Sequence, residues 1–403
     1  MSAAVTWSQA SPRGRRHVHA CCRAASLLLL LVVSVCPRQP VHAEPPHQPV
    51  NLSFLHPIST NRDPGISTNF RLSILYARAG AVRGVDLGGL VARTDGDFRG
   101  LEFAAAHSWI GGELRGFAAT GLVSAVRGEA RGLQLAGLVN FDREAFTGVQ
   151  GAGLFNSVDG EIVGAQLSSF FNLSGGDARW LQLAGVANVC GDSLIGAQLS
   201  SFNFTTGGLT GLQVGAGNFA SHVYGVQASL VNLAGDVRGA QIGAVNISQR
   251  LDGVPLGLVN LSEENGELDW LVLGSNLAAI SIGVRTAIGG LYSMVTAGAI
   301  DLHDDRSNTL MLDWHYGWAT ELTPRLRLGG DLGFVHFIPH PSDDPQVNDR
   351  LHFAVQPRIV AEQRVGQRIR VLGGAGASVI WNEYSKQATS DTEPLVLLGI
   401  SFQ

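Results

Sequence analysis

The sequence predicts an all-β protein in which tandem β repeats of 14–16 residues are followed by an antiparallel barrel-like section. Three observations lead to this fold class. Glycine, glutamine and asparagine recur in step every sixteen residues through the middle of the chain, as in "GLQLAGLVNFDREAFT" and the unit after it. Mid-unit glycines, β-branched residues and the lack of a 3.6-residue apolar stripe argue against helices. The last third of the chain instead alternates apolar and polar residues over long stretches.

Residues 1–43 have the layout of a secretory signal peptide that is removed from the mature chain. Arginines precede the apolar run "AASLLLLLVVSVC", and "VHA" ends at Ala43. The apolar run is shorter than the roughly 20 residues that a transmembrane helix needs. Cys36 raises the alternative of lipidation, but bulky Val35 stands before it. We therefore expect an exported protein.

Removal of this leader leaves 23 basic against 33 acidic residues, a net charge of −10 with histidine neutral. A nucleic-acid partner would need a basic face, so none is expected. Three of the four cysteines lie in the leader, and only Cys190 remains, which excludes an intramolecular disulfide framework. No later apolar run reaches 18 residues, so any membrane crossing would have to use β-strands.

Residues 44–83 are expected to form entry strands or a cap, and residues 84–266 form the tandem array. Each unit opens on a glycine, except the one that begins at Trp180, and ends in a polar turn such as "SVDGE". The period is sixteen up to Gly196, then one unit of fifteen leads into units of fourteen. The side-chain amides that recur at equivalent positions of the sixteen-residue units are Gln134, Gln150, Gln166 and Gln182, and Asn140, Asn156, Asn172 and Asn188.

Two β architectures fit the array. In a β-solenoid, equal coils stack in parallel and the recurring amides form hydrogen-bonded ladders. In an antiparallel meander or barrel each unit is a strand plus a turn, and the alternation around Gln134 is typical of a membrane strand. The shorter units lose one small residue between glutamine and asparagine. This loss would flip the asparagine of a straight strand but is tolerated at a corner, so the solenoid is favoured.

Residues 267–403 are predicted to form an antiparallel outer-membrane-type barrel of about eight strands. Leu328, Leu332 and Phe334 alternate with Arg327 and Asp331. Short connections such as "LTP" alternate with long polar ones such as "IPHPSDDPQVND", as periplasmic turns and external loops do. The end "EPLVLLGISFQ" resembles the terminal strand of outer-membrane proteins, although Gln403 follows the aromatic residue.

No constellation in the sequence predicts catalysis, a cofactor or a metal, and the protein is expected not to be an enzyme. Cys190 has no evident histidine or aspartate partner. His303 with Asp304 and Asp305, and His340 with Asp343 and Asp344, carry the right atoms for a Ca²⁺ or Zn²⁺ site, but solvated polar loops are the preferred interpretation. The amide rows are expected to satisfy one another rather than bind a sugar or peptide.

The array resembles a family of bacterial repeat-containing surface or outer-membrane proteins with "GVQLAGLVN"-type repeats. The residues that carry the resemblance are "GLQLAGLVN" at Gly132, "GVPLGLVN" at Gly253 and the entry segment "NLSFLHPISTNRDPGISTNF". The units "GLEFAAAHS" and "GFAATGLVS" depart from the pattern, as expected near a cap. The resemblance implies a β-rich envelope protein and no catalytic residues.

These features together predict a non-enzymatic, exported structural or interaction protein of the outer membrane or cell surface. The expected partners are outer-membrane lipid and an envelope polymer or another surface protein. Two alternatives remain: a soluble, ligand-binding β-solenoid in the periplasm, and a large pore-forming barrel that uses the repeats as strands. Adjacency of Asn140 and Asn156 in register would select the solenoid.

Overall fold

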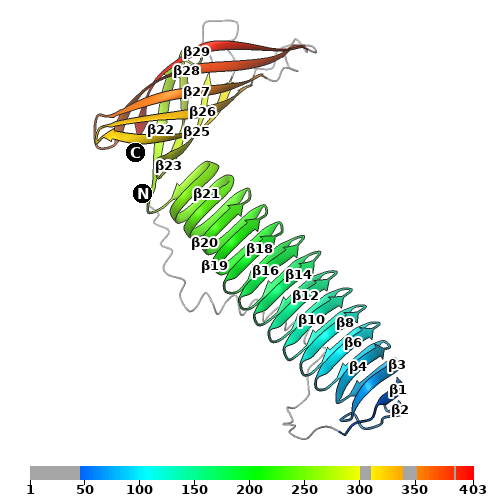
Figure 1. Cartoon of the computed structure of the whole chain (residues 1–403). Coiled ribbons are helices and arrows are strands. Elements are labelled where there is room, and N and C mark those ends of the chain that lie inside the picture. The colour runs from blue at the N-terminus through cyan, green and yellow to red at the C-terminus, as the bar shows by residue number, and fades with distance from the viewer. Residues whose placement is uncertain (1–45, 300–309, 339–351, 385–386) are drawn as a thin grey trace. The chain divides into compact units, whose positions relative to one another are not determined.

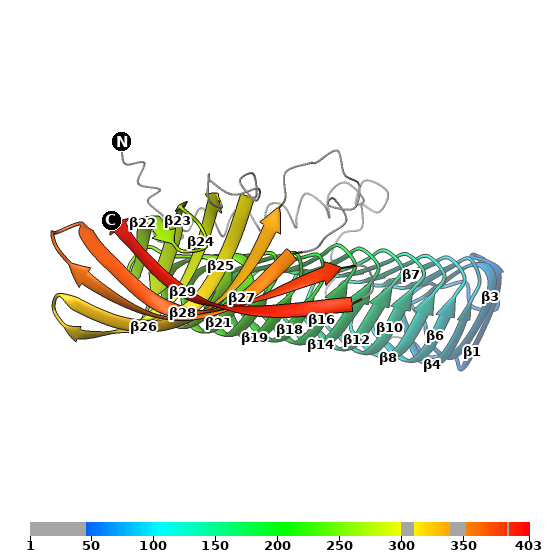
Figure 2. The ribbon, with the colours of Figure 1, turned by 90° about the horizontal axis from the view of Figure 1, so that it is seen from above.

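The computed structural model describes residues 46–299, 310–338, 352–384 and 387–403, and every regular element in these ranges is a β-strand. The chain forms two compact units, one up to Gly225 and one from Val226 to Gln403. Figures 1 and 2 show stacked coils along the repeats and a separate barrel at the C-terminal end of the chain. The predicted signal peptide, residues 1–43, lies outside the described residues.

In the first unit the repeats form a β-solenoid whose coils each contribute two short strands (Figure 1). The first strands of the coils are β4 (Ala81–Gly88), β6 (Phe98–Ala104), β8 (Leu114–Thr120), β10 (Ala130–Ala136), β12 (Phe146–Ala152), β14 (Ile162–Ser168), β16 (Ala178–Ala184) and β18 (Leu194–Leu199). The second strands are β5 (Val91–Thr94), β7 (His107–Ile110), β9 (Val123–Val126), β11 (Val139–Asp142), β13 (Phe155–Val158), β15 (Phe171–Ser174) and β17 (Ala187–Cys190). Each strand pairs in parallel with its counterpart in the next coil, so the solenoid prediction is confirmed.

The stacking begins before the first glycine-led unit. β3 (Ser67–Ala79) pairs in parallel with β4 and β5, and β1 (Val50–Leu55) pairs in parallel with β3. β2 (Ile58–Ser59) adds a short antiparallel edge to β1. The segment expected as entry strands therefore already forms a coil.

The corner between the two strands of a coil explains the change of period. In the sixteens the chain bends at Gly137 and Leu138, between β10 and β11. The fifteen-residue unit bends at Ser200 and Ser201, directly after β18, which is one residue shorter than β10. The small residue is lost at this corner, so glutamine and asparagine both still point inward. From β19 (Phe202–Val214) and β20 (Gly217–Ala228) onward the strands run longer, and β21 (Val231–Ser262) spans several turns of the coil.

The opening glycine of each unit is required by close backbone stacking. Gly148 has φ +135°, and a Cβ there would lie 1.9 Å from the carbonyl oxygen of Gly132 in the previous coil. Only glycine tolerates this conformation and contact without strain. The register Gly132 to Gly148 continues through the array, which keeps the amides in step.

In the second unit, eight antiparallel strands form a closed barrel (Figure 1). They are β22 (Gly266–Ser275), β23 (Ile280–Ile288), β24 (Leu291–Ala299), β25 (Leu310–Thr323), β26 (Leu326–Ile338), β27 (His352–Arg364), β28 (Ile369–Tyr384) and β29 (Gln387–Phe402). β29 pairs with β22 and closes the ring. The barrel thus uses only the C-terminal strands, and the alternative of a large barrel built from the repeats is wrong.

Candidate functional site: amide core, charged lumen and apolar exteriors

The predicted glutamines form a continuous ladder inside the solenoid. Nε2 of Gln150 donates to Oε1 of Gln134 at 3.0 Å, Gln166 donates to Gln150 at 2.9 Å, and Gln182 donates to Gln166 at 2.8 Å. All four side chains are buried. The period of the repeat brings them together because each coil places its glutamine directly above the previous one.

The predicted asparagines form a second ladder on the other strand of each coil. Nδ2 of Asn140 donates to Oδ1 of Asn156 at 2.8 Å, and the bonds from Asn156 to Asn172 and from Asn172 to Asn188 are each 2.9 Å. The same amides also donate to backbone carbonyls, as Asn140 does to Gly151 at 2.8 Å. These buried amides donate to one another and to the backbone, while Oδ1 of Asn140 has no hydrogen-bond partner among the described residues. All of them are buried and present no atoms to an external ligand.

At the N-terminal end the glutamine column is replaced by charged residues that sequence reasoning missed. Arg71, Asp86, Glu102 and Ala118 stand in register above Gln134. Nε of Arg71 donates to Oδ1 of Asp86 at 2.8 Å, and both side chains are fully buried. Asp86 and Glu102 each follow a unit-opening glycine by two residues, so alignment of the units was the signal that could have placed them.

Two carboxyl groups in this core are buried without a cation of their own. Burial, reinforced by the charge of Asp86, raises the pKa of Glu102 to about 8. Its Oε2 accepts from Ser108 at 2.8 Å, while Oε1 has no hydrogen-bond partner among the described residues. Burial also raises the pKa of Asp142 to about 7, although Gln134 and Gln150 donate to it at 3.1 and 2.9 Å. Near neutral pH the solenoid therefore holds protons on carboxyl groups in its interior.

The exterior of the solenoid carries large apolar side chains on the first strands, at the corner and, at Phe171 and Phe204, beyond the corner. Large apolar side chains point outward from the first strands and from the corner of successive coils. These outward residues are Leu87, Phe103, Leu135, Leu183 and Val214 on the first strands and Leu90, Leu122, Leu138, Leu154 and Phe170 at the corner. We call this surface the apolar edge. Phe103 and Leu135 border an open hollow of about 650 Å³ whose floor consists of small residues such as Ala119 and Gly121.

The unit-opening glycines, such as Gly132 and Gly148, stack in register, and we call them the glycine column. Charged side chains lie on the other side of this column, at the start of the same strands. Arg83, Arg99, Arg115, Arg131 and Arg179 occupy equivalent outward positions in their coils. Several of them pair with acidic residues of the preceding turn, as Arg131 does with Glu129 at 2.7 Å. We call these five residues the arginine column. The glycine column separates it from the apolar edge.

Trp180 occupies one position of the glycine column. It has φ +100° and is the only non-glycine residue with positive φ among the residues that the structure describes. Its side chain is 73% exposed. The sequence places it at a unit start, but the strain at this position is visible only in the structure.

The lumen of the barrel is filled by ion pairs and apolar side chains. Arg285 bridges Asp269, at 2.6 Å, and Glu362, and Asp331 accepts hydrogen bonds from Tyr292 at 2.6 Å and Arg358 at 2.8 Å. Between these clusters the lumen is packed by Leu271, Leu273, Met294, Val360 and Leu372. These lumen side chains are all buried, which is what an eight-stranded barrel is wide enough to hold.

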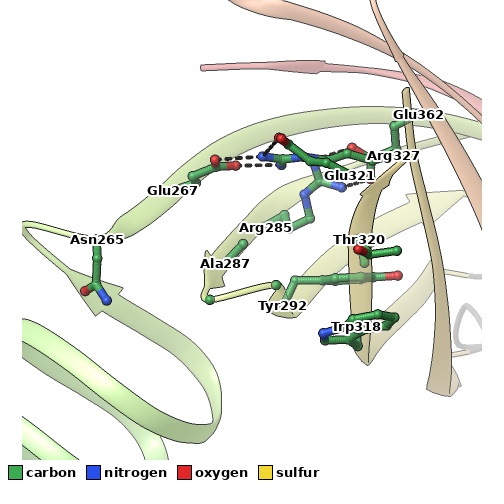
Figure 3. A pocket seen from close by; sticks show the side chains of 13 residues that line it. Asn265, Glu267, Arg285, Ala287, Tyr292, Trp318, Thr320, Glu321, Arg327 and Glu362 are labelled. Carbon is green, nitrogen blue, oxygen red and sulfur yellow. Dashed lines mark hydrogen bonds and ion pairs between the residues drawn. The ribbon is translucent and has the colours of Figure 1, made fainter. Parts of the chain in front are cut away.

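A cavity of about 330 Å³ opens at the end of the barrel where the short turns lie (Figure 3). Glu267 and Arg327 form its charged rim through bonds of 2.8 and 2.9 Å, and Trp318 and Tyr292 line it below. The charged groups of the rim are paired with each other, so the cavity offers no single unbalanced charge to a ligand.

The outer wall of the barrel is apolar, as the alternation predicted. Leu328, Leu332, Phe334, Leu398 and Ile400 are exposed, while their neighbours along the strands point into the lumen. Within the described residues no helix is long and apolar enough to cross a membrane.

The last coil of the repeat packs on this outer wall within the second unit. The hydroxyl of Tyr316 donates to the carbonyl of Pro255 at 2.9 Å, and Ser293 Oγ donates to the carbonyl of Leu258 at 2.9 Å. The backbone N–H of Asn260 donates to Thr286 Oγ1 at 3.1 Å. These three polar residues point outward from the barrel, close to its short-turn end, and satisfy the backbone edge that the final coil would otherwise leave open.

The remaining candidate residues divide into two groups. Cys190 is buried, and burial raises its pKa to about 12, so its thiol is unreactive. The residues around His303 and His340 that were weighed as metal ligands lie outside the described residues. In the part of the chain that is described, no group of three or more histidine, cysteine, aspartate or glutamate side chains could hold a metal ion.

Comparison with known proteins gives likenesses for the barrel alone. No family model matches the chain, and no curated protein matches it. Among solved structures it is similar to the N-terminal β-barrel domain of Pseudomonas aeruginosa OprF, with 14% identity over 34% of this chain and 96% of that one and a TM-score of 0.24. It is also similar to a de novo designed transmembrane β-barrel, with 16% identity over 34% of this chain and 92% of that one and a TM-score of 0.22. A third likeness is to the designed barrel TMB2.3, with 13% identity, 36% and 98% coverage and a TM-score of 0.21. At these values the likenesses carry no argument about function, and the barrel is assigned from its own strand pairing.

Proposed function

We propose that this chain is a non-enzymatic outer-membrane or surface protein, in which the barrel is the membrane anchor and the solenoid is a scaffold. One observation carries the proposal: the barrel is apolar outside and charged inside. A soluble barrel would instead face water with polar side chains and fill its interior with apolar ones. In a lipid bilayer the observed arrangement is the favourable one, because a closed barrel leaves no unpaired strand edge in the hydrocarbon.

The two alternative functions have less support. A pore would need an open lumen, whereas the clusters around Arg285 and Asp331 occupy the interior of the barrel. A ligand-binding solenoid would need accessible amides, whereas Gln150 and Asn156 are fully buried. The resemblance to the bacterial repeat-containing surface proteins supports the same proposal, and membership in that family is part of it.

Leu332→Arg and Leu322→Arg together test the membrane anchor. Both side chains are exposed, at 46% and 56%, but Leu332 lies midway along β26 and Leu322 is the second-last residue of β25. In a bilayer, arginine costs about 2–4 kcal/mol at mid-depth and about 0–1 kcal/mol near the interface. We expect Leu332→Arg to reduce the folded, heat-modifiable form recovered in the outer-membrane fraction, and Leu322→Arg to leave it nearly unchanged.

A soluble barrel gives a different pattern. Both arginines would then point into water, and the two variants would behave alike. Equal recovery of the two variants, or recovery of the wild-type protein as a freely soluble periplasmic species, contradicts the anchor.

A further inference from the structure

We propose that the apolar edge of the solenoid contacts the surface of a lipid bilayer, with Trp180 as its anchor at the boundary between hydrocarbon and headgroups. The inference deepens the proposed function and rests on it, since it names the partner of the scaffold. It is argued from the distribution of side chains over the coil exterior, from the strained Trp180 and from the packing of the last coil.

The exterior of several coils is ordered from charged to apolar. Along β10 the outward residues are Arg131, then Gly132, then Leu135, and the corner adds Leu138. The order recurs along β4, with Arg83, Gly84 and Leu87, whereas Thr147, Val163 and Ile195 stand at the arginine position in β12, β14 and β18. The outward charges beside the apolar stripe are paired, as Arg131 is with Glu129, so this row is polar without being cationic. An apolar stripe beside a polar row is amphipathic, and in a bilayer its apolar side chains enter the acyl region while the paired charges stay among the headgroups and water.

Trp180 lies between these two zones. It stands in the glycine column, with Arg179 on the charged side and Leu183 on the apolar side. Tryptophan is enriched at this depth of a membrane because its ring is apolar and its indole N–H is polar. A non-glycine residue at φ +100° is strained, and strained residues persist most often where they serve function.

Within the second unit, the last coil packs against the outer wall of the barrel. Its backbone is hydrogen-bonded to Tyr316 and Ser293 on the outside of β25 and β24. Leu256 and Leu258 of that coil and Ile242 of the previous one are exposed at about 40%. The apolar exterior of the repeat therefore begins, within the second unit, directly against a wall that faces lipid under the proposed function.

A bilayer suits this surface better than a second copy of the chain. The apolar residues lie on both sides of a corner, on β10 and after it, so the surface is convex. Side chains of very different size follow one another along it, from Phe103 to Ala119 to Leu135, and leave the hollow between them. A fluid acyl phase fills such relief, whereas two rigid copies would leave it unpacked.

The test uses the chain without the predicted signal peptide, residues 44–403, in vesicles of phosphatidylethanolamine and phosphatidylglycerol, with one nitroxide label per variant. This chain lacks Cys21, Cys22 and Cys36. Cys190→Ser removes the native thiol, and serine fits because Ser174 and Thr205 occupy the equivalent positions of the adjacent coils. Labels at Leu135 and Leu183 probe the apolar edge, and a label at Glu129 is the matched control on the charged side. A label at Phe334 on the barrel wall reports membrane insertion separately. Collision of each nitroxide with oxygen and with a water-soluble nickel chelate is measured.

We expect the Phe334, Leu135 and Leu183 labels to lose nickel broadening and gain oxygen broadening, and the Glu129 label to keep nickel broadening. In Trp180→Gly, broadening of the Leu183 label by the nickel chelate should reappear. In Trp180→Tyr it should stay absent. A lipid-exposed Phe334 label with water-exposed Leu135 and Leu183 labels overturns this inference and leaves the membrane anchor intact. A water-exposed Phe334 label overturns the anchor itself. Spin–spin broadening at Leu135 that disappears on dilution with unlabelled protein identifies a second copy as the partner and also overturns the inference.

Discussion

Trp180→Gly is predicted to stabilise the solenoid, although it removes the largest side chain from its coil. Equivalent positions in neighbouring coils are glycines, and Gly164 and Gly196 both have φ +141°. Trp180 adopts φ +100° in the same column, which no β-strand residue other than glycine prefers. The ring is 73% exposed, so its removal loses little buried area.

The expected size of the effect follows from two opposing contributions. Relief of a strained backbone conformation is worth about 1–3 kcal/mol. Glycine gives the unfolded chain additional freedom, which costs about 0.4–1 kcal/mol. We therefore expect a net gain of about 1 kcal/mol, which corresponds to about fivefold slower opening of the coil in hydrogen exchange.

Hydrogen exchange followed by mass spectrometry over residues 164–211 measures this effect locally, which is needed because coils of a solenoid unfold locally. Trp109→Gly is the matched control. Trp109 has no positive φ, and its ring lies 5.3 Å from the guanidinium carbon of Arg127. Its replacement should accelerate exchange around β7. Faster exchange in Trp180→Gly, or the same sign in both variants, would refute the reasoning about strain.

Three further predictions concern the solenoid interior. Gln166→Leu removes two ladder hydrogen bonds and leaves a buried donor and a buried acceptor of its neighbours without a partner. The free energy of unfolding of the array should therefore fall by about 2–6 kcal/mol, measured as a lower thermal midpoint. An unchanged midpoint would contradict the ladder. Glu102→Gln should weaken the pH dependence of solenoid stability. Burial raises the pKa of Glu102 in the folded protein to about 8, above the ordinary value of 4.5 for glutamate. Folding therefore takes up a proton between these two values, and the wild type loses stability as pH rises through this window. The variant should be more stable than wild type at pH 9 and similar at pH 4 in thermal melts, while Glu129→Gln, at a half-buried residue, should change neither. Cys190 should resist alkylation at pH 8 until the protein is denatured, and rapid labelling of the native protein would contradict its burial.

Much of the fold was predictable because the repeat constrains it. The interval between Asn140 and Asn156 equals one coil, and the loss of a small residue near Gly137 is tolerated only at a corner. The eight barrel strands were predictable because residues such as Leu332 and Asp331 alternate over long strands. Their outward and inward placement is as the alternation indicated.

The specific partners inside each unit were not predictable in the same way. Arg285 and Glu362 are 77 residues apart, and their contact depends on how β29 closes the barrel against β22. Arg71 stands before the first glycine-led unit, so its position in the glutamine column is visible only once β3 is seen to stack on β4. Alternation gives the direction of a side chain, whereas pairing depends on register between distant strands.

The same distribution of side chains in both units explains why the sequence left two architectures open. Gln134 points into the solenoid and Leu135 points out, just as Asp331 points into the barrel and Leu332 points out. A polar interior with an apolar exterior gives a period-two alternation in either fold, so alternation could not separate them. Two features do separate them: close stacking of identical backbones, which requires glycine at positions such as Gly148, and pairing of residues one period apart. A large exposed apolar surface of this kind marks a site of contact with an apolar phase or a partner. The apolar edge of the solenoid and the outer wall of the barrel therefore each have a contact to be identified. The label at Leu135 reports on the first surface and the label at Phe334 on the second, independently of each other.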